Sequence, residues 1–235
     1  MSKKILPVSY SRVNKWRNCP YGYYLKYVES IPEPETGGGV WDAAWMGTAA
    51  HWGIEQRSET EGVEKYREKH SDQKAEYQIK RAVLAALTLP QMTVDVHRRY
   101  EYEIDGGVFH GFVDCINGFH DIVDFKLSNN RAYYMNSPQL AIYKSELNRL
   151  GFDIQYCAYL FMPKIMPRKN EAFKDYETRF SDYTAAYCPV RGEESAVIAF
   201  WRDAAQMIGA DVFPVNSGSH CKWCGYKGGH CFSGE

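Results

Sequence analysis

The sequence lacks an apolar run long enough to cross a membrane, and its first residues lack the pattern of a signal peptide. It also lacks an excess of positive charge, since 28 Lys and Arg residues against 29 Asp and Glu residues give a net charge of −1. Internal repeats and low-complexity segments are not found either. These absences predict an intracellular protein that is not bound to a membrane. Any contact with nucleic acid would depend on a local basic patch.

What the sequence contains is ordinary for a globular protein with a substantial core. Hydrophobic residues make up 45% and charged residues 24% of the 235 positions, which suits one large domain over residues 1–235. Aromatic residues reach 15%, a share that fits both a packed core and a surface that stacks on bases. In a reducing compartment, the seven cysteines are metal ligands or buried thiols rather than disulfides.

The order of helical and strand patterns predicts an α/β or α+β fold with a mixed central sheet. Three parts follow from it: a helical N-terminal part over residues 1–60, a sheet core over 92–180 and a cysteine-rich tail over 214–235. Helices are predicted over residues 10–17, 21–29, 42–59, 138–150 and 193–208, and one or two more over residues 61–90. Strands are predicted over residues 94–104, 108–116, 122–126, 154–162 and 173–180.

The central strand, within His120–Ser128, carries an unusual pair of charges. Because side chains alternate along a strand, Asp124 and Lys126 share one face while Phe125 points to the other. Opposite charges on an otherwise apolar strand are costly unless they are paired or used. The simple alternative is an edge strand with an ordinary salt bridge.

Further acids and a histidine could join Asp124 in a metal site. Asp114 lies on the preceding predicted strand, and two acids on adjacent strands can share one or two divalent cations such as Mg²⁺. Lys126 can position or activate the attacking water and offset charge that builds up on a phosphate. His51 could add a nitrogen ligand and shift the preference toward Mn²⁺. Alternatively, His51 is a core histidine and Asp114 a solvated acid beside a turn.

Two polar residues on the next predicted helix could contact a DNA backbone near that metal. Gln139 and Tyr143 are four residues apart, so they share one helix face. Core packing of Tyr143 is an equally simple explanation. Basic residues that could contact phosphates, or could instead be solvated surface charges, are Arg12, Lys15, Lys164, Arg168 and Lys169.

Cysteines near the C-terminus have the spacing of metal ligands. Cys221 and Cys224 are separated by two residues, Cys231 follows, and Cys19 at a predicted helix break is the best fourth ligand. This spacing alone leaves zinc and iron–sulfur open, and His220 and His230 keep a mixed zinc site open as well. The remaining cysteines, which lie in or near predicted strands, indicate small buried hydrophobes: Cys115, Cys157 and Cys188.

As a set, these segments resemble the RecB-type branch of the PD-(D/E)xK nuclease superfamily, near the CRISPR-associated RecB-like exonucleases and the nuclease domain of AddB. The resemblance covers most of the chain in the family's order. It includes the opening Ser9-Tyr-Ser-Arg, Cys19-Pro20 and Tyr24-Leu-Lys-Tyr27, then Gly47-Thr-Ala-Ala-His51 for GxxxH and Gly111-Phe-Val-Asp114 for the first metal-binding acid. It continues with Asp124-Phe-Lys126 for (D/E)xK, Gln139-Leu-Ala-Ile-Tyr143 for QxxxY, and Cys221, Cys224 and Cys231.

The resemblance implies a restriction-endonuclease-like core, a mixed sheet flanked by helices, with a lobe in which the cysteine tail closes on Cys19. It implies Mg²⁺ or Mn²⁺ bound by His51, Asp114, Asp124 and the carbonyl of Phe125. It also implies a structural [4Fe–4S] cluster, with zinc as the less favoured metal, on Cys19, Cys221, Cys224 and Cys231.

The implied function is a metal-dependent exonuclease that hydrolyses the phosphodiester bonds of linear DNA, as in DNA repair and recombination. Its catalytic residues would be Asp114, Asp124, Lys126, Gln139 and Tyr143. No helicase motif is found, so the nuclease would act alone or with a recruited helicase, CRISPR or recombination protein. A stand-alone protein of this size suits the cytoplasm of a bacterial or phage-infected cell.

Two alternatives stay open at this point. The first is a DNA-binding or adaptor protein that keeps the fold and the cluster but does not cleave. The second is a domain of other activity with a zinc-ribbon tail.

Overall fold

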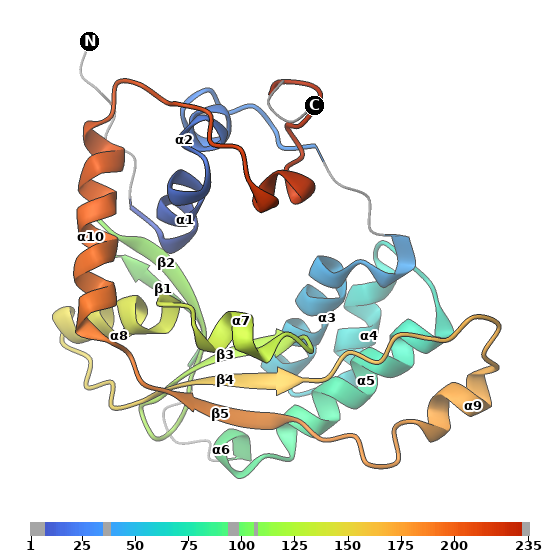
Figure 1. Ribbon diagram of the computed structural model, residues 1–235. Coiled ribbons are helices and arrows are strands. Elements are labelled where there is room, and N and C mark those ends of the chain that lie inside the picture. The colour runs from blue at the N-terminus through green and yellow to red at the C-terminus, as the bar shows by residue number, and fades with distance from the viewer. Residues whose placement is uncertain (1–7, 35–38, 94–98, 106–107, 232–235) are drawn as a thin grey trace. The chain divides into compact units, whose positions relative to one another are not determined.

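The structure is a computed structural model that describes residues 8–34, 39–93, 99–105 and 108–231 (Figure 1). The chain forms two compact units. The terminal unit comprises Met1–Gly37, Ile104–Gly111 and Glu193–Glu235, and the central unit comprises Gly38–Glu103 and Phe112–Gly192. That residues 1–235 act as one domain stays a prediction. Within the described ranges, no helix is long and apolar enough to cross a membrane.

A five-stranded sheet runs in the order β1-β2-β3-β4-β5. Strand β3 pairs antiparallel with β2 and parallel with β4, and β4 pairs antiparallel with β5, so the predicted mixed sheet is confirmed. The strands span Arg99–Asp105 (β1), His110–Ile116 (β2), Ile122–Leu127 (β3), Cys157–Met162 (β4) and Ala186–Val190 (β5). The start of the predicted strand over 94–104 and the glycines of the turn after it lie outside the described residues.

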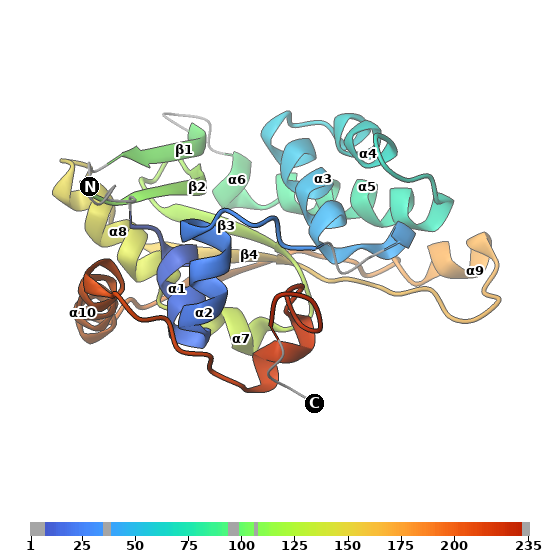
Figure 2. The same cartoon turned by 90° about the horizontal axis from the view of Figure 1, so that it is seen from above.

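Helices of the central unit cover both faces of β3 and β4 (Figure 2). On one face, α3 and α5 bury their apolar sides against Val123, Phe125 and Leu160. On the other face lie α7 and α8, and the Tyr134 ring of α7 packs on Tyr159 and Phe161 of β4. The helices span Ala43–Glu55 (α3), Glu59–Arg67 (α4), Gln73–Leu87 (α5), Pro90–Thr93 (α6), Arg131–Met135 (α7), Gln139–Arg149 (α8) and Phe173–Thr178 (α9).

Local sequence explains where α3, α4 and α5 begin and how closely they cross. Asp42, Ser58 and Asp72 are the N-caps, and each side chain accepts main-chain N–H bonds from its first turn. At the α3–α4 crossing, a Cβ on Gly53 would lie 3.0 Å from the Cα of Gly62. Glycine therefore permits the close approach of the two helices.

The prediction of a strand over residues 173–180 is wrong, because residues 173–178 form helix α9. Its aromatic residues suggest a strand by composition, but Phe173, Tyr176 and Phe180 follow the three- and four-residue spacing of a helix. The rings of Tyr176 and Phe180 meet edge to face with centroids 5.1 Å apart, and both side chains are fully buried. The strand that completes the sheet is β5, over residues that the sequence pattern left unassigned.

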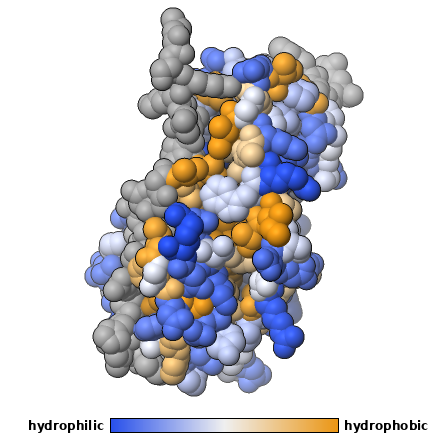
Figure 3. Space-filling view, turned by 90° about the vertical axis from the view of Figure 1, so that its left-hand side faces the viewer, coloured by the Kyte–Doolittle hydropathy of each residue, from blue (hydrophilic) through white to orange (hydrophobic). Residues whose placement is uncertain are grey.

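The terminal unit contains α1 (Tyr10–Asn18), α2 (Pro20–Tyr23), a π-helical segment at Tyr24–Val28, α10 (Glu194–Gly209) and a 3₁₀ turn at Ser219–Trp223. Ser9 is the N-cap of α1, where its side chain accepts the Arg12 N–H, and the predicted break at Cys19-Pro20 is confirmed. Arg17 and Asp203 join α1 to α10 through an ion pair of 2.5 Å. Figure 3 views the side on which α10 lies and shows apolar residues interspersed with hydrophilic ones.

Candidate active site

The charged pair of β3 faces α7 and α8. Asp124 lies opposite Tyr159 and Lys126 opposite Phe161 in the parallel register with β4, so both charges share one sheet face, as predicted. The Lys126 ammonium pairs directly with the Asp124 carboxylate. Strand β3 is central rather than at an edge, so the edge-strand alternative is wrong although the salt bridge exists.

Burial and neighbouring charges shift the pKa of both groups. Burial, reinforced by the Asp114 carboxylate, raises the pKa of Asp124 well above its usual value, although Lys126 opposes this. Burial alone would lower the pKa of Lys126, but Asp124 and Asp114 outweigh it and raise that pKa. Lys126 therefore keeps its positive charge beside the crowded carboxyl groups of Asp124 and Asp114.

Asp114 reaches this region because β2 and β3 stop pairing early. The pairs between the two strands are Cys115 with Val123 and Ile116 with Ile122. Beyond them, the main-chain N–H of Phe125 donates to Asp114 Oδ2 at 2.8 Å. The Asp114 carboxylate thus takes the place of the β2 carbonyl that would accept this N–H in a regular ladder, and it lies against the middle of β3.

His51 approaches the same residue of β3 from α3. Its Nε2 lies 2.7 Å from the carbonyl oxygen of Phe125, and its Nδ1 lies 3.6 Å from Asp114 Oδ2. Because a carbonyl oxygen only accepts, Nε2 carries the proton of that bond. The structure therefore gathers His51 and Asp114 on the main chain of Phe125, next to Asp124.

The chemistry of these donors suits a hard divalent cation. Two carboxylates and a main-chain carbonyl are oxygen donors of the kind that Mg²⁺ prefers, and an imidazole adds affinity for Mn²⁺. In this structure the donors engage one another, since Lys126 pairs with Asp124 and His51 bonds to the Phe125 carbonyl. Among the described residues, no three His, Cys, Asp or Glu side chains converge as a preformed metal site. Binding of an ion would therefore replace these internal bonds.

Gln139 and Tyr143 lie on one side of α8, as their spacing predicts. Gln139 Nε2 donates to the Tyr143 hydroxyl at 3.2 Å. Tyr143 is buried, so its ring contributes to the core while its hydroxyl holds the Gln139 amide. Helix α8 packs on β3 and β4. Whether the two residues contact DNA stays a prediction.

Three of the predicted phosphate-binding residues have internal partners, among them Arg12, whose guanidinium lies 5.1 Å from the Tyr27 ring centroid. Lys15 pairs with Glu33 at 2.9 Å, and Lys164 donates to the Trp41 carbonyl at 3.0 Å. Burial also lowers the pKa of Lys164. Arg168 and Lys169 are exposed in the loop that follows β4. Arg168 and Lys169 are therefore better candidates than Lys164 for a phosphate contact in the central unit.

The four cysteines predicted to hold a cluster all lie in the terminal unit and are partly exposed. The tail returns to the first helices there: the Asn216 amide donates to the Asn18 carbonyl at 2.8 Å, and Tyr21 N–H donates to the Pro214 carbonyl at 3.1 Å. Cys19 and Cys221 Sγ each accept a main-chain N–H, which is typical of cluster sulfurs. Within the described residues three of these thiols do not converge, so a cluster on them stays a prediction.

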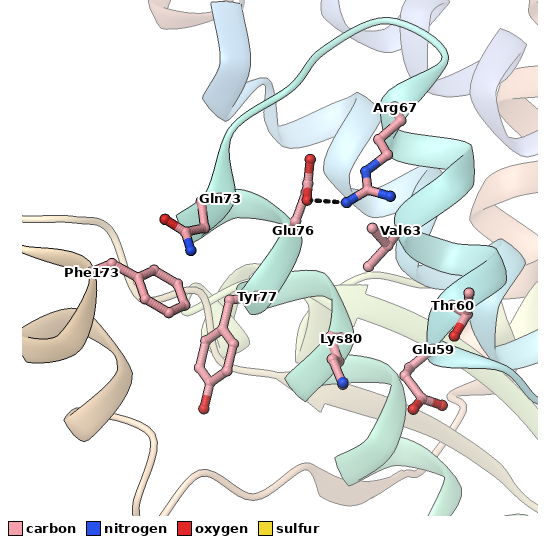
Figure 4. A pocket seen from close by; sticks show the side chains of 9 residues that line it. All are labelled: Glu59, Thr60, Val63, Arg67, Gln73, Glu76, Tyr77, Lys80 and Phe173. Atoms are coloured by element: carbon pink, nitrogen blue, oxygen red, sulfur yellow. Dashed lines mark hydrogen bonds and ion pairs between the residues drawn. The ribbon is translucent and has the colours of Figure 1, made fainter.

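A separate cleft of about 320 Å³ lies on α4, α5 and the start of α9 (Figure 4). Its walls include the Arg67–Glu76 ion pair and the rings of Tyr77 and Phe173, which meet edge to face at 5.5 Å. Neither the β3 charges nor His51 line this cleft. This cleft is therefore not the candidate active site, which is defined by its charges.

Comparison with known proteins supports the same interpretation. The model of the PD-(D/E)XK nuclease superfamily matches residues 7–228, nearly the whole chain. The chain therefore belongs to this superfamily, whose members typically use a divalent metal ion and act on nucleic acid. A comparison with curated proteins gives no match.

Sequence reasoning missed the aromatic residues that surround Lys126. Its Nζ lies 5.3 Å from the ring centroid of Tyr134 and 6.0 Å from that of Tyr159. Alternation along β4 could have put Tyr159 and Phe161 on one face. The register that brings this face to Lys126 is visible only in the folded sheet.

Proposed function

We propose that this protein is a metal-dependent nuclease of the RecB-like branch that degrades linear DNA from an end. The observation that carries the proposal is the buried Asp124–Lys126 pair on a central strand, with Asp114 and His51 held at the intervening residue. Buried charges of this cost are retained where they are used. The superfamily match makes hydrolysis of a phosphodiester bond the appropriate reaction.

The site residues divide the work of hydrolysis between them. Asp114, Asp124, His51 and the Phe125 carbonyl would hold Mg²⁺ or Mn²⁺. When bound, such an ion polarises phosphoryl oxygens and lowers the pKa of a bound water. Lys126 supplies a fixed positive charge that orients the attacking water and offsets negative charge on the phosphate. A P–O bond forms to the water oxygen, the bond to the departing sugar oxygen breaks, and that oxygen takes up a proton.

We further propose that Cys19, Cys221, Cys224 and Cys231 hold a [4Fe–4S] cluster, with zinc as the less favoured metal. The hydrogen bonds of the tail to Asn18 and Tyr21, on either side of Cys19, support this proposal. The cluster would be structural. Purification without air should give a brown protein with visible absorbance, whereas a colourless protein that contains zinc would contradict the iron–sulfur assignment.

Digestion of end-labelled linear DNA tests the nuclease proposal. The wild type with Mn²⁺ should degrade single- or double-stranded DNA, and Lys126→Ala should lose at least about 100-fold in rate. Lys174→Ala, which removes an exposed lysine of α9, is the matched control and should keep the wild-type rate. If Lys126→Ala digests DNA as fast as the control does, Lys126 has no catalytic role.

One observation suits a second candidate function, a DNA-binding or adaptor protein that acts with a helicase, repair or CRISPR complex without cleaving. The direct Lys126–Asp124 ion pair satisfies both charges internally, as a purely structural pair would. Calorimetry with Mg²⁺ and Mn²⁺ separates the two functions. Absence of binding at millimolar concentrations would favour the adaptor, and binding that is lost in Asp124→Asn would favour the nuclease.

A further inference from the structure

Aromatic side chains form a continuous wall beside the charged pair of β3. The wall consists of Tyr134 from α7 with Tyr159 and Phe161 from β4, and its ring centroids are 5.7 to 6.0 Å apart. Lys126 Nζ faces the Tyr134 ring at 5.3 Å. The wall therefore borders the position where the candidate site would hold a phosphate.

Tyr133 extends this wall into solvent. Its ring meets Tyr134 edge to face, with centroids 5.1 Å apart and an interplanar angle of 85°. The Tyr133 side chain is 64% exposed, although a tyrosine in a packed domain usually buries most of its ring. Two ring contacts thus connect an exposed aromatic surface to the catalytic lysine.

A cation accompanies the aromatic surface. Arg131, two residues before Tyr133 and the first residue of α7, is exposed, and its guanidinium lies 5.6 Å from the Phe161 ring centroid. Proteins that hold single-stranded nucleic acid combine aromatic rings that stack on bases with cations that follow the backbone. Arg131 and Tyr133 reproduce this combination next to a candidate hydrolytic site.

We propose that Tyr133 is the stacking platform for an unpaired base next to the scissile phosphate, which makes single-stranded DNA or a frayed end the preferred substrate. The inference rests on the proposed nuclease function. An internal base of a duplex has both faces covered by its neighbours, so only an unstacked base can offer a face to Tyr133. Arg131 would contact the adjoining phosphate.

Binding of single-stranded oligonucleotides to the intact protein tests this proposal. Fluorescence anisotropy is measured in Ca²⁺ with a labelled strand of about 12 nucleotides, and with strands in which one abasic position is moved along the chain. For the wild type, one abasic position should raise Kd by about 5- to 100-fold, the loss expected for one base–aromatic stack. Tyr133→Ala should raise Kd for the intact strand by a similar factor and should no longer respond to that abasic position.

Matched variants separate stacking from general disturbance. Tyr133→Trp retains an aromatic face and should keep the sensitivity to the abasic position. Tyr156→Ala removes a tyrosine that is 68% exposed just before β4, at the end of that strand away from Phe161. It should bind every strand as the wild type does.

The outcomes distinguish this inference from the function on which it rests. If the wild type digests DNA but Tyr133→Ala binds all strands with wild-type affinity, only the stacking role is overturned. The same holds if Tyr133→Ala weakens binding but still responds to the abasic position as the wild type does. If the wild type neither binds nor digests DNA, the nuclease proposal fails and the stacking role fails with it.

Discussion

The face of the central unit that carries the candidate active site and the cysteine tail of the terminal unit are held by different means. Strand β3 pairs with β4 over all six of its residues, and Val123 and Phe125 behind the charges are fully buried. In the tail, residues 214–231, Tyr226 is the one residue that is buried. The tail depends on main-chain and hydroxyl bonds, such as that from Tyr226 to the Ile31 carbonyl at 2.6 Å.

The difference is between a site that an apolar core holds and a segment that the proposed cluster would crosslink. Apolar burial of Val123 and Phe125 holds the strand that carries these charges in place. A segment with so little buried apolar surface gains little from the hydrophobic effect. Its stability depends mainly on hydrogen bonds and on any metal group that links it to the rest of the unit. We therefore expect substitutions at the active-site face to affect catalysis more than folding, and those at the tail cysteines to do the reverse.

The largest effect is expected for Asp114→Asn, which tests the first half of this comparison. The amide oxygen of asparagine can still accept the Phe125 N–H, but the charge is lost. DNA digestion should fall at least about 100-fold, with little change in the free energy of unfolding. Asp114→Ala is the comparison variant: it leaves that N–H without its acceptor and should also lose about 1 to 3 kcal/mol of stability. Equal stability of the two variants would argue against the structural role of this hydrogen bond.

The tail should respond to Cys224→Ser with loss of bound iron and of visible absorbance. Because the crosslink would be broken, Tm should fall by about 5 °C or more. Iron analysis and thermal unfolding, both without air, measure the two effects. Cys188→Ser, a partly exposed cysteine of β5, is the control and should retain the iron. Retention of iron in Cys224→Ser would contradict the assigned ligands.

A smaller effect is expected at the helix crossing behind His51. A Cβ at Gly53 would lie 2.7 Å from Val83 Cγ2 and 3.0 Å from Gly62 Cα, so Gly53→Ala should cost about 1 to 3 kcal/mol by overpacking. Gly47→Ala on the same helix meets no atom within 4 Å and should stabilise by up to about 1 kcal/mol. Urea unfolding of both variants checks the difference, and the same sign for both would contradict it.

The smallest effect concerns the pH dependence of the terminal unit. Burial opposes ionisation of Glu33, but Lys15 and Lys26 outweigh it and hold its pKa below the usual value. A lowered folded-state pKa stabilises the fold above the unfolded pKa of about 4.3, and this contribution is lost as the pH falls through the folded value. Glu33→Gln should therefore be less stable than the wild type at pH 7 by under about 1 kcal/mol. The difference should vanish in acid, and a difference independent of pH would exclude this ion-pair effect.

Local patterns accounted for much of the fold. The cap at Ser9, the break at Cys19-Pro20 and the end of α8 before Gly151 follow from chemistry within a few residues. Alternation placed Asp124 and Lys126 on one face of β3. Composition failed at residues 173–178, where aromatic side chains at helical spacing form α9.

The sequence by itself determined which residues carry charge, thiol and amide groups, and which neighbours share a helix or strand face. Only the tertiary structure decided that β2 pairs with β3 from Cys115 onward and not before it, so that the Asp114 carboxylate accepts the Phe125 N–H. It also brought His51 to the carbonyl of that same residue, 74 positions away in the sequence, and set the aromatic wall beside Lys126. The physical reason is that periodicity reports forces between near neighbours, whereas strand register and helix docking are set by the packing of the whole core.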